Sequence, residues 1–434
     1  MFLGALALFL GGSIIGGLST GMPGLITARA VQGLGGGGLM ILSQAIIADL
    51  VPTRRRGKYM GVIGMVWGFS SVVSPLLGGW FTDTVGWRWV FWFNLPLGVL
   101  AVMAAVVFLK MPEHKPSRPR ADALGIATMA VAVAAIVFLT SWGGREFAWD
   151  SPVILGLVAA ALVAGTAFVF AEKRAAEPIM PLHLFRKRNF NLVTFGGLCA
   201  AVAMFGVIAY MPSYIQMVTG LSATGAGLLM VPMSAGITIT SLSTGALASR
   251  TGRYKWMPIA TCFGLALGLY LLSTLRPDSP IWLIGVYLFI LGAGNGFGFQ
   301  IIMLIAQNTF PITEVGTATA ANNFFRQIGA ALGSAVVGTM YTTRLMALLT
   351  QRLASHPAAP PDLDPTSLTP GVVHHLPEAV RSAVVSSYNE ALTPVFLLIV
   401  PLMILAGVAL FFIEEKPLAL TNAVPTEAEP VSHR

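Results

Sequence analysis

Apolar segments of about twenty residues recur along the whole chain, and they constrain the fold more than any other feature. A helix of about 20 apolar residues is long enough to cross a lipid bilayer. Charged residues make up only 10% of the 434 residues, whereas soluble proteins average about 25%. Because a membrane β-barrel would show short alternating segments instead, we predict an all-α polytopic membrane protein.

Twelve segments are predicted to span the membrane. They lie at about 2–20, 25–50, 58–82, 89–110, 122–142, 152–172, 190–211, 222–248, 256–275, 281–306, 316–342 and 391–413. The segment 343–390 is rich in Pro, Ser and His. It is predicted to be a mostly irregular outer loop with a short helix near Glu378–Tyr388.

The basic residues predict the orientation. Eighteen of the 26 Lys and Arg residues fall in the turns on the side of the first residue, six fall on the other side, and Arg29 and Arg326 lie within spans. Cytoplasmic loops carry an excess of Lys and Arg. Both termini are therefore predicted to be cytoplasmic, in a cell-membrane protein. The net charge of +8 resides in short turns, so it does not indicate a nucleic-acid partner.

No constellation of catalytic or metal-ligating residues stands out in the sequence. Cys199 and Cys262 both fall inside apolar spans, which does not indicate a disulfide framework or a metal site. The six histidines all lie in predicted loops or the tail. The sequence therefore predicts no metal, no cofactor and no enzymatic activity. Residues 1–20 lack the basic start of a signal peptide, so that reading is disfavoured.

Arg29 lies inside the second predicted span, in the stretch Arg29-Ala-Val-Gln32-Gly33-Leu-Gly35-Gly36. An arginine at bilayer depth costs roughly 2.5–3.5 kcal/mol on insertion scales, so a function is expected for it. Two interpretations stay open. Arg29 is either a clamp that hydrogen-bonds the backbones of neighbouring helices or a gate and proton-relay residue.

The same stretch resembles the fourth-helix motif of the major facilitator superfamily. The places of that family's fifth-helix antiporter motif are taken here by Gly61, Ser70, Ser74, Pro75, Gly78 and Gly79. The cytoplasmic-loop motif of the family is matched by Gly245, Arg250, Gly252 and Arg253, with Ser249 in place of its usual aspartate. The segments 83–98, 322–329 and 415–418 resemble the fourteen-helix drug–proton antiporter branch.

The register of this resemblance implies that family helices 1 and 2 are missing from the chain. It implies a partial N-terminal bundle of four spans (1–110), two linker helices with cytoplasmic loops (111–189) and a C-terminal six-helix bundle (190–413, with the outer loop 343–390). A cytoplasmic tail (414–434) follows.

In that branch an acidic residue on helix 1 is implicated in proton or cation coupling. The nearest carboxylates here are Asp49 and Asp83, for which helix capping or interfacial pairing is the favoured role. The candidates for gating or coupling are Arg29, Gln32, Asp49, Asp83 and Arg326. For Pro75 with Gly78 and Gly79, a plain kink and a role in limiting leak both remain open.

Polar and soft apolar residues in the spans are candidates to line a central cavity. Helical spacing predicts that Asn322 and Arg326 share one helix face and that Asn323 and Gln327 share another. The cavity candidates are Trp67, Phe205, Tyr210, Met233, Asn295, Gln300, Asn322, Asn323, Phe325 and Gln327. Helix-to-helix hydrogen bonding of the polar residues and ordinary packing of the apolar ones are the alternatives.

The resemblance implies proton-coupled export of small lipophilic or cationic compounds by alternating access, energised by the proton gradient. Its partners would be the lipid bilayer, protons and a small-molecule substrate, and no periplasmic adaptor protein is indicated. Two alternatives remain: a transport-incompetent fragment, and a uniporter or symporter of a polar metabolite. The sequence does not identify the substrate.

Overall fold

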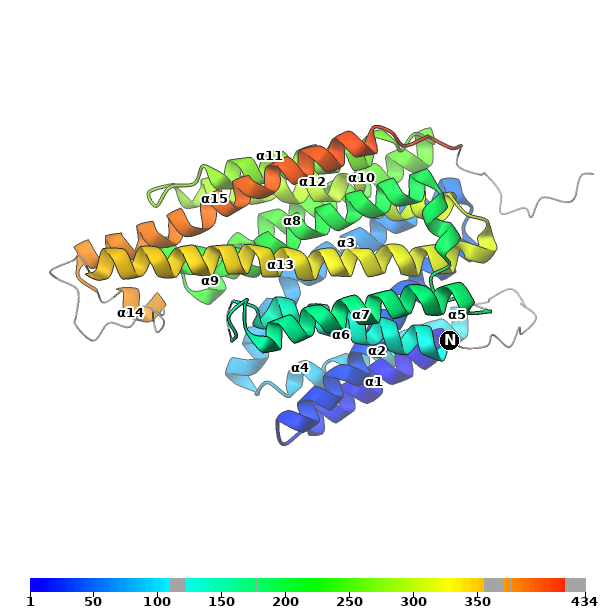
Figure 1. The fold of residues 1–434 in the computed structure, drawn as a ribbon, viewed down its shortest axis with the longest axis horizontal. Coiled ribbons are helices and arrows are strands. Elements are labelled where there is room, and N and C mark those ends of the chain that lie inside the picture. Colours follow the sequence, from blue (N-terminus) through cyan, green and yellow to red (C-terminus); the bar gives the residue numbers. More distant parts are fainter. Residues whose placement is uncertain are drawn as a thin grey trace, which may run out of the picture.

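The computed structural model describes residues 1–108, 122–144, 146–176, 178–354, 368, 370–374 and 376–417. Regular structure in these residues is helical, apart from one isolated bridge between Gly143 and Phe147. The long helices lie side by side along one axis of the molecule (Figure 1). The basic residues predicted at 110–120, Arg145 and the tail beyond Pro417 lie outside the described residues.

Seven helices form the first part of the chain. They are α1 (Phe2–Leu18), α2 (Met22–Leu50), α3 (Thr53–Thr84), α4 (Trp89–Trp92), α5 (Asn94–Phe108), α6 (Ala123–Trp142) and α7 (Pro152–Arg174). Local signals fix the starts of two of them. The Asp122 carboxylate accepts a hydrogen bond from the Gly125 amide, and the Ser151 hydroxyl accepts one from Ile154, as N-caps do.

The second part of the chain continues from the short 3-10 helix η1 to α15. Its elements are η1 (Leu182–Arg186), α8 (Arg188–Thr219), α9 (Ala223–Leu229), α10 (Val231–Thr251), α11 (Trp256–Ser273), α12 (Ile281–Asn308), η2 (Ile312–Glu314), α13 (Val315–Ala354), α14 (Pro370–His374) and α15 (Glu378–Leu410).

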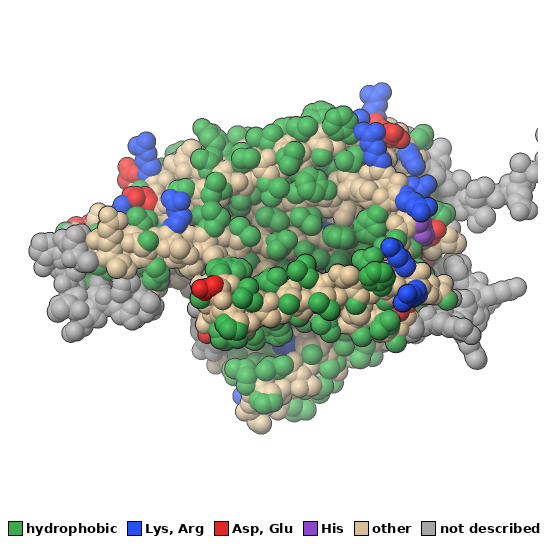
Figure 2. Space-filling view, in the orientation of Figure 1, with side chains coloured by type: hydrophobic (Ala, Val, Ile, Leu, Met, Phe, Trp, Pro, Cys, Tyr) green, Lys and Arg blue, Asp and Glu red, His purple; other side chains and the backbone are tan. Residues whose placement is uncertain are grey.

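Each of the twelve predicted spans coincides with a helix. Nine helical segments among the described residues are long and apolar enough to cross a membrane, and α1 is apolar but shorter. Apolar side chains cover the flank of the molecule, while Lys and Arg gather mainly at one end (Figure 2). We call this the basic end. It carries the start of α8, the end of α10 and Lys416.

Three groups of helices build the molecule. Helices α8, α10, α11, α12, α13 and α15 share the main apolar core, and α6 and α7 form a pair in which α6 contacts α13. Helix α1 packs on α2, α4 and α5. Helix α3 follows this first group in the sequence, but it packs chiefly along α10 and also contacts α12. It thereby joins the two parts of the chain.

The predicted outer loop 343–390 is wrong at its start, because helix α13 continues to Ala354. The helix predicted near Glu378–Tyr388 is present, but it is the first part of the 33-residue α15 rather than a separate short helix. Leu345, Leu349 and Leu353 recur every fourth residue and are buried. Leucines with this helical spacing form one apolar face, so the end of α13 packs against α15 although both segments are rich in polar residues.

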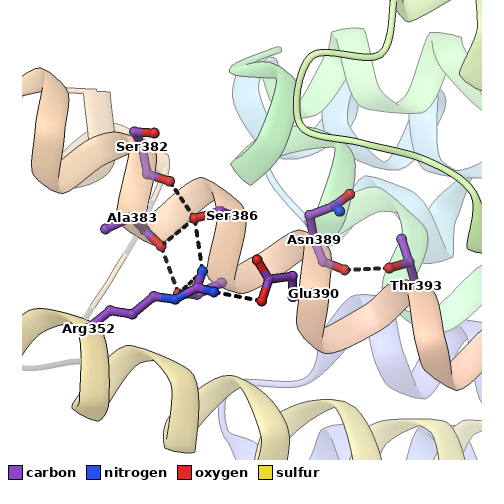
Figure 3. A network of polar contacts seen from close by, with 8 residues as sticks. Arg352, Ser382, Ala383, Ser386, Asn389, Glu390 and Thr393 are labelled. Atoms are coloured by element: carbon purple, nitrogen blue, oxygen red, sulfur yellow. Dashed lines mark hydrogen bonds and ion pairs between the residues drawn. The ribbon is translucent and has the colours of Figure 1, made fainter.

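A polar network joins α13 and α15 beyond the predicted spans. The Arg352 guanidinium donates to the Ser386 hydroxyl at 2.9 Å and to the Glu390 carboxylate at 2.6 Å (Figure 3). Arg352 and Glu390 were predicted to lie in a loop and Ser386 in a separate short helix, so the sequence did not predict that they pair.

Candidate functional site

A seam of small residues joins α3 to α10. A methyl group at Gly61 would lie 2.8 Å from the Ser241 carbonyl oxygen, and one at Gly57 would lie 2.9 Å from that of Gly245. The two backbones are therefore too close for any larger residue at these positions. Two of the motif residues singled out from the sequence, Gly61 and Gly245, thus meet across this seam.

The seam ends at the basic end with a contact to the cytoplasmic-loop motif. The Ser249 hydroxyl accepts a 2.9 Å hydrogen bond from the Lys58 backbone N–H in the first turns of α3. Gly252 then ends α10 in the left-handed conformation, at φ +73°, which glycine adopts without strain. The side chains of Arg250 and Arg253 lie on the exposed surface nearby.

The antiporter-motif positions lie farther along α3, which is helical without interruption from Ser70 to Gly79. Ser70, Ser74 and Gly78 line a cavity of about 440 Å³ between α3 and the helices α4 and α5. Asn94 lines its other wall. Pro75, Gly79 and Asp83 belong to the same helix, and the Pro75 and Asp83 side chains are outside what the structure describes.

Side chains from five helices meet at the centre of the molecule. Trp67 of α3 packs against Phe205 of α8 and Phe299 of α12, with ring centroids 6.3 and 5.4 Å apart. The Arg326 guanidinium of α13 lies 4.5 Å above the Phe299 ring. We call these residues, together with Asn323 of α13 and Gln44 of α2, the central cluster.

A hydrogen-bond relay runs through the central cluster. Arg326 donates to Asn323 Oδ1 at 2.6 Å, and Asn323 Nδ2 donates to Gln44 Oε1 at 3.0 Å. All three side chains are buried. Gln44 was not among the candidates. It lies near the end of an apolar span, and the presence of a glutamine in such a span is the only signal that the sequence gives for its role.

A shared helix face does not decide which of these residues bond each other. Arg326 bonds Asn323, three residues before it, and Asn322 instead donates to Thr194 Oγ1 of α8 at 3.2 Å. Gln327 points away from this relay and lines a separate pocket. Residues three and four apart share a helix face, so spacing alone does not choose between them.

Arg29 takes part in a similar relay on α2. Its guanidinium donates to Gln32 Oε1 at 3.0 Å, and Gln32 Nε2 donates to Ser13 Oγ of α1 at 2.9 Å. The guanidinium also lies 4.8 Å from the centre of the Phe91 ring. Arg29 therefore reaches its neighbours through side chains, whereas the clamp interpretation expected bonds to their backbones.

Asp49 lies at the basic end of α2, away from the central cluster. Its carboxylate acts electrostatically on Arg56, whose guanidinium donates to the Val51 and Ala48 carbonyls. Burial lowers the pKa of Arg56, and the Asp49 charge partly opposes this shift. The arginine thus closes the carboxyl end of α2, where a cation is favourable.

The remaining cavity candidates are spread over the second bundle. Met233 and Asn295 are buried, and neither amide atom of Asn295 has a hydrogen-bond partner in the described part of the chain. A methyl at Gly64 of α3 would meet the buried Gln300 at 3.2 Å. Tyr210 bonds the Ser334 carbonyl at 3.0 Å, and Phe325 packs on Phe185.

The segment after α15 forms a strap across the basic end. The Glu415 carboxylate accepts hydrogen bonds from the backbone N–H groups of Tyr254 at 2.7 Å and Lys255 at 3.2 Å. The Tyr254 hydroxyl donates to the Lys416 carbonyl, and Asn189 bonds the Glu414 backbone in both directions. We call residues 414–416 the C-terminal strap.

Long apolar helices around buried polar side chains are typical of a multi-pass membrane protein. The family model of the Major Facilitator Superfamily matches residues 1–334. The chain belongs to this superfamily.

Relatives from several organisms resemble the chain over nearly its full length. An uncharacterized MFS-type transporter of Mycobacterium tuberculosis is 39% identical over 422 residues, covering 96% of this chain and 60% of the relative. The multidrug transporter protein MdtP of Bacillus subtilis is 33% identical, covering 97% and 82%. The chain thus spans about 60% of the length of the mycobacterial transporter.

Two solved structures share the fold. The human organic anion transporter MFSD10 has a TM-score of 0.58 at 16% identity, over 93% of this chain and 76% of that one. The proton:xylose symporter XylE has a TM-score of 0.54 at 16% identity, over 96% and 81%. At this identity the likeness shows the fold alone.

Proposed function

We propose that this protein is a secondary exporter of small lipophilic compounds, driven by proton antiport through alternating access. The observation that carries the proposal is the central cluster. Aromatic rings from three helices and a buried cation from a fourth meet there. Relatives named multidrug transporters support the substrate class.

The chemistry of the central cluster favours an apolar substrate. Trp67, Phe205 and Phe299 offer ring faces and edges, which pack on varied apolar bodies. Arg326 places a positive charge among them. Coulomb repulsion disfavours a cationic group at the same point, so neutral lipophilic compounds suit the site better than cations do.

The contacts between the two parts of the chain supply the surfaces that alternating access requires. The Gln44–Asn323 bond joins α2 to α13. We propose that this bond breaks when the molecule opens toward the basic end, which the charge bias favours as the cytoplasmic end. The α3–α10 seam, with its Ser249–Lys58 bond, would remain packed as the pivot, because its glycines bring the two backbones into direct contact.

Proton coupling is proposed from the antiporter-motif positions on α3. The test is transport of a neutral lipophilic fluorescent dye by the protein in proteoliposomes. A gradient that is acidic on the dye-accumulating side is expected to drive uptake, and dye addition is expected to move protons in the opposite direction. Dye movement in the same direction as protons would establish symport, and absence of dye movement would refute export.

Arg326→Met provides a variant for the same assay. It keeps a long apolar side chain on Phe299 but removes the charge and the hydrogen bond to Asn323. We expect transport to fall at least about tenfold, as loss of a charge-assisted hydrogen bond implies. Arg276→Met is the matched control, because Arg276 is exposed in the loop between α11 and α12 and belongs to none of the motifs. Equal dye transport by the two variants would show that Arg326 has no role in transport.

A further inference from the structure

A second pocket lies beside the central cluster, between the linker helix α6 and the bundle. It has a volume of about 350 Å³, within the range of small-molecule sites. Val133 and Val137 of α6 form one wall, Phe205 of α8 forms a second, and Phe324, Gln327 and Ala331 of α13 form a third. We call this the side pocket.

Gln327 gives the side pocket its polar group. Its side chain is exposed to the pocket, and its amide makes no hydrogen bond to any of the described residues. The other lining residues are apolar except for Ser334, whose hydroxyl donates to the Ala331 carbonyl. An amide at membrane depth without a partner is costly. A molecule that fills the pocket and bonds Gln327 would remove this cost.

Phe205 connects the side pocket with the central cluster. It lines the pocket and also packs edge-on against Trp67, with centroids 6.3 Å apart. One aromatic ring therefore separates the two regions. The pocket is open on its other side, because Val137 is 43% exposed on a helix that is apolar throughout. The side pocket thus lies between the lipid-facing flank and the centre.

We propose that the side pocket is an entry site for the transported amphiphile, with Gln327 as its hydrogen-bonding partner and Phe205 as the partition to the central cluster. This proposal rests on the proposed export function. The occupant is a molecule with an apolar body and one hydrogen-bonding group. A lipid acyl chain would fill the apolar walls, but it has no group that bonds the Gln327 amide.

Equilibrium binding in nanodiscs of phosphatidylcholine tests the proposal. The probes are a lipophilic fluorescent dye with one hydroxyl group and its analogue with a methyl group in that place. Gln327→Leu is expected to weaken binding of the hydroxyl dye about fivefold, the scale of one neutral hydrogen bond, and to leave the analogue unchanged. Ala331→Trp, which fills the pocket, is expected to weaken both dyes at least about tenfold.

Two further variants complete the experiment. Val137→Trp fills the same pocket from α6 and serves if Ala331→Trp does not fold. Val131→Trp is the matched control, since Val131 lies on the same helix, is 53% exposed and does not line the pocket. Its binding of both dyes is expected to equal that of the unmodified protein.

The outcomes separate this proposal from the export function. Unchanged binding in both pocket-filling variants would overturn the side pocket as a substrate site, even if transport persists. Absence of saturable binding in the unmodified protein would assign the pocket to membrane lipid and overturn it as well. Saturable, Gln327-dependent binding without proton-driven transport would support the pocket and refute export.

Discussion

The Asn323 side-chain amide donates a 3.0 Å hydrogen bond to Gln44, a residue that lies 279 positions earlier in the chain. The bond joins α13 to α2, and both side chains are buried. Arg326 in turn donates to the same asparagine. Asn323 is therefore the residue through which the buried cation of α13 is linked to the first part of the chain.

Asn323→Leu is expected to lower the stability of the protein. The substitution keeps the side-chain volume but leaves Gln44 Oε1 and the Arg326 guanidinium without their shared partner. Buried polar groups that lose a partner cost about 1–3 kcal/mol. Thermal unfolding in detergent measures the effect. The control is Gln216→Leu, whose hydrogen bond runs within its own helix, and an equal loss there would refute the special role of Asn323.

Gly61→Ala is expected to destabilise the α3–α10 seam. The added methyl would lie 2.8 Å from the Ser241 carbonyl, and overpacking of this kind costs about 1–3 kcal/mol. The methyl group of Gly78→Ala on the same helix would meet no atom of the neighbouring described residues within 4 Å. That control is expected to stabilise the helix by about 0.5–1 kcal/mol. If the unfolding midpoints of the two variants moved in the same direction, the close packing of the α3–α10 seam at Gly61 would be contradicted.

Glu415→Gln is expected to loosen the loop between α10 and α11. The carboxylate accepts from two backbone amides, and a charged acceptor makes the stronger bond. Hydrogen exchange at Tyr254 and Lys255 should therefore accelerate. Glu414→Gln is the matched control, because the Glu414 side chain is exposed and only approaches Arg188, at 3.9 Å. Unchanged exchange in Glu415→Gln would show that the strap does not hold this loop.

The C-terminal strap is also expected to weaken at alkaline pH. Burial raises the pKa of the Tyr254 phenol above its ordinary value of about 10. The folded protein thus holds this proton more tightly than the unfolded chain. The resulting stabilisation is fully present below about pH 10 and is lost as the pH rises through the raised pKa.

Unfolding midpoints of the unmodified protein and of Tyr254→Phe measure this effect between pH 8 and strongly alkaline pH. The variant cannot donate to the Lys416 carbonyl at any pH, so it should be less stable at pH 8. The difference between the two proteins should shrink above about pH 10. A constant difference over the whole range would exclude Tyr254 as the titrating group.

The sequence predicted the helices well because the bilayer imposes one requirement on every span. Apolar length alone located all twelve, from Phe2–Leu18 to Glu378–Leu410. The same criterion did not extend α13 to Ala354, and it did not join the short helix predicted near Glu378–Tyr388 to the last span. Arg352 and Glu390 were assigned to a loop, although they pair with each other across two helices.

The sequence predicted several residues of the candidate site, but it did not predict how they contact one another. Arg326, Asn323, Trp67 and Phe205 stood out as polar or aromatic residues within apolar spans, and they do meet. Their partners Gln44 and Phe299 come from other helices, and helical spacing carries no information about contacts between helices. The same limit explains why Gln327 was grouped with Asn323, when it faces the side pocket instead.

The α3–α10 seam also has a consequence for biosynthesis. Helix α3 ends at Thr84 and α10 begins at Val231, so about 150 residues separate the two partners during translation. At about 5–20 residues per second, α3 emerges roughly 7–30 s before the helix that covers its glycine face. Throughout that interval the nascent chain carries an unpaired interhelical surface, so an insertase or chaperone that shields α3 should raise the yield of correctly assembled protein.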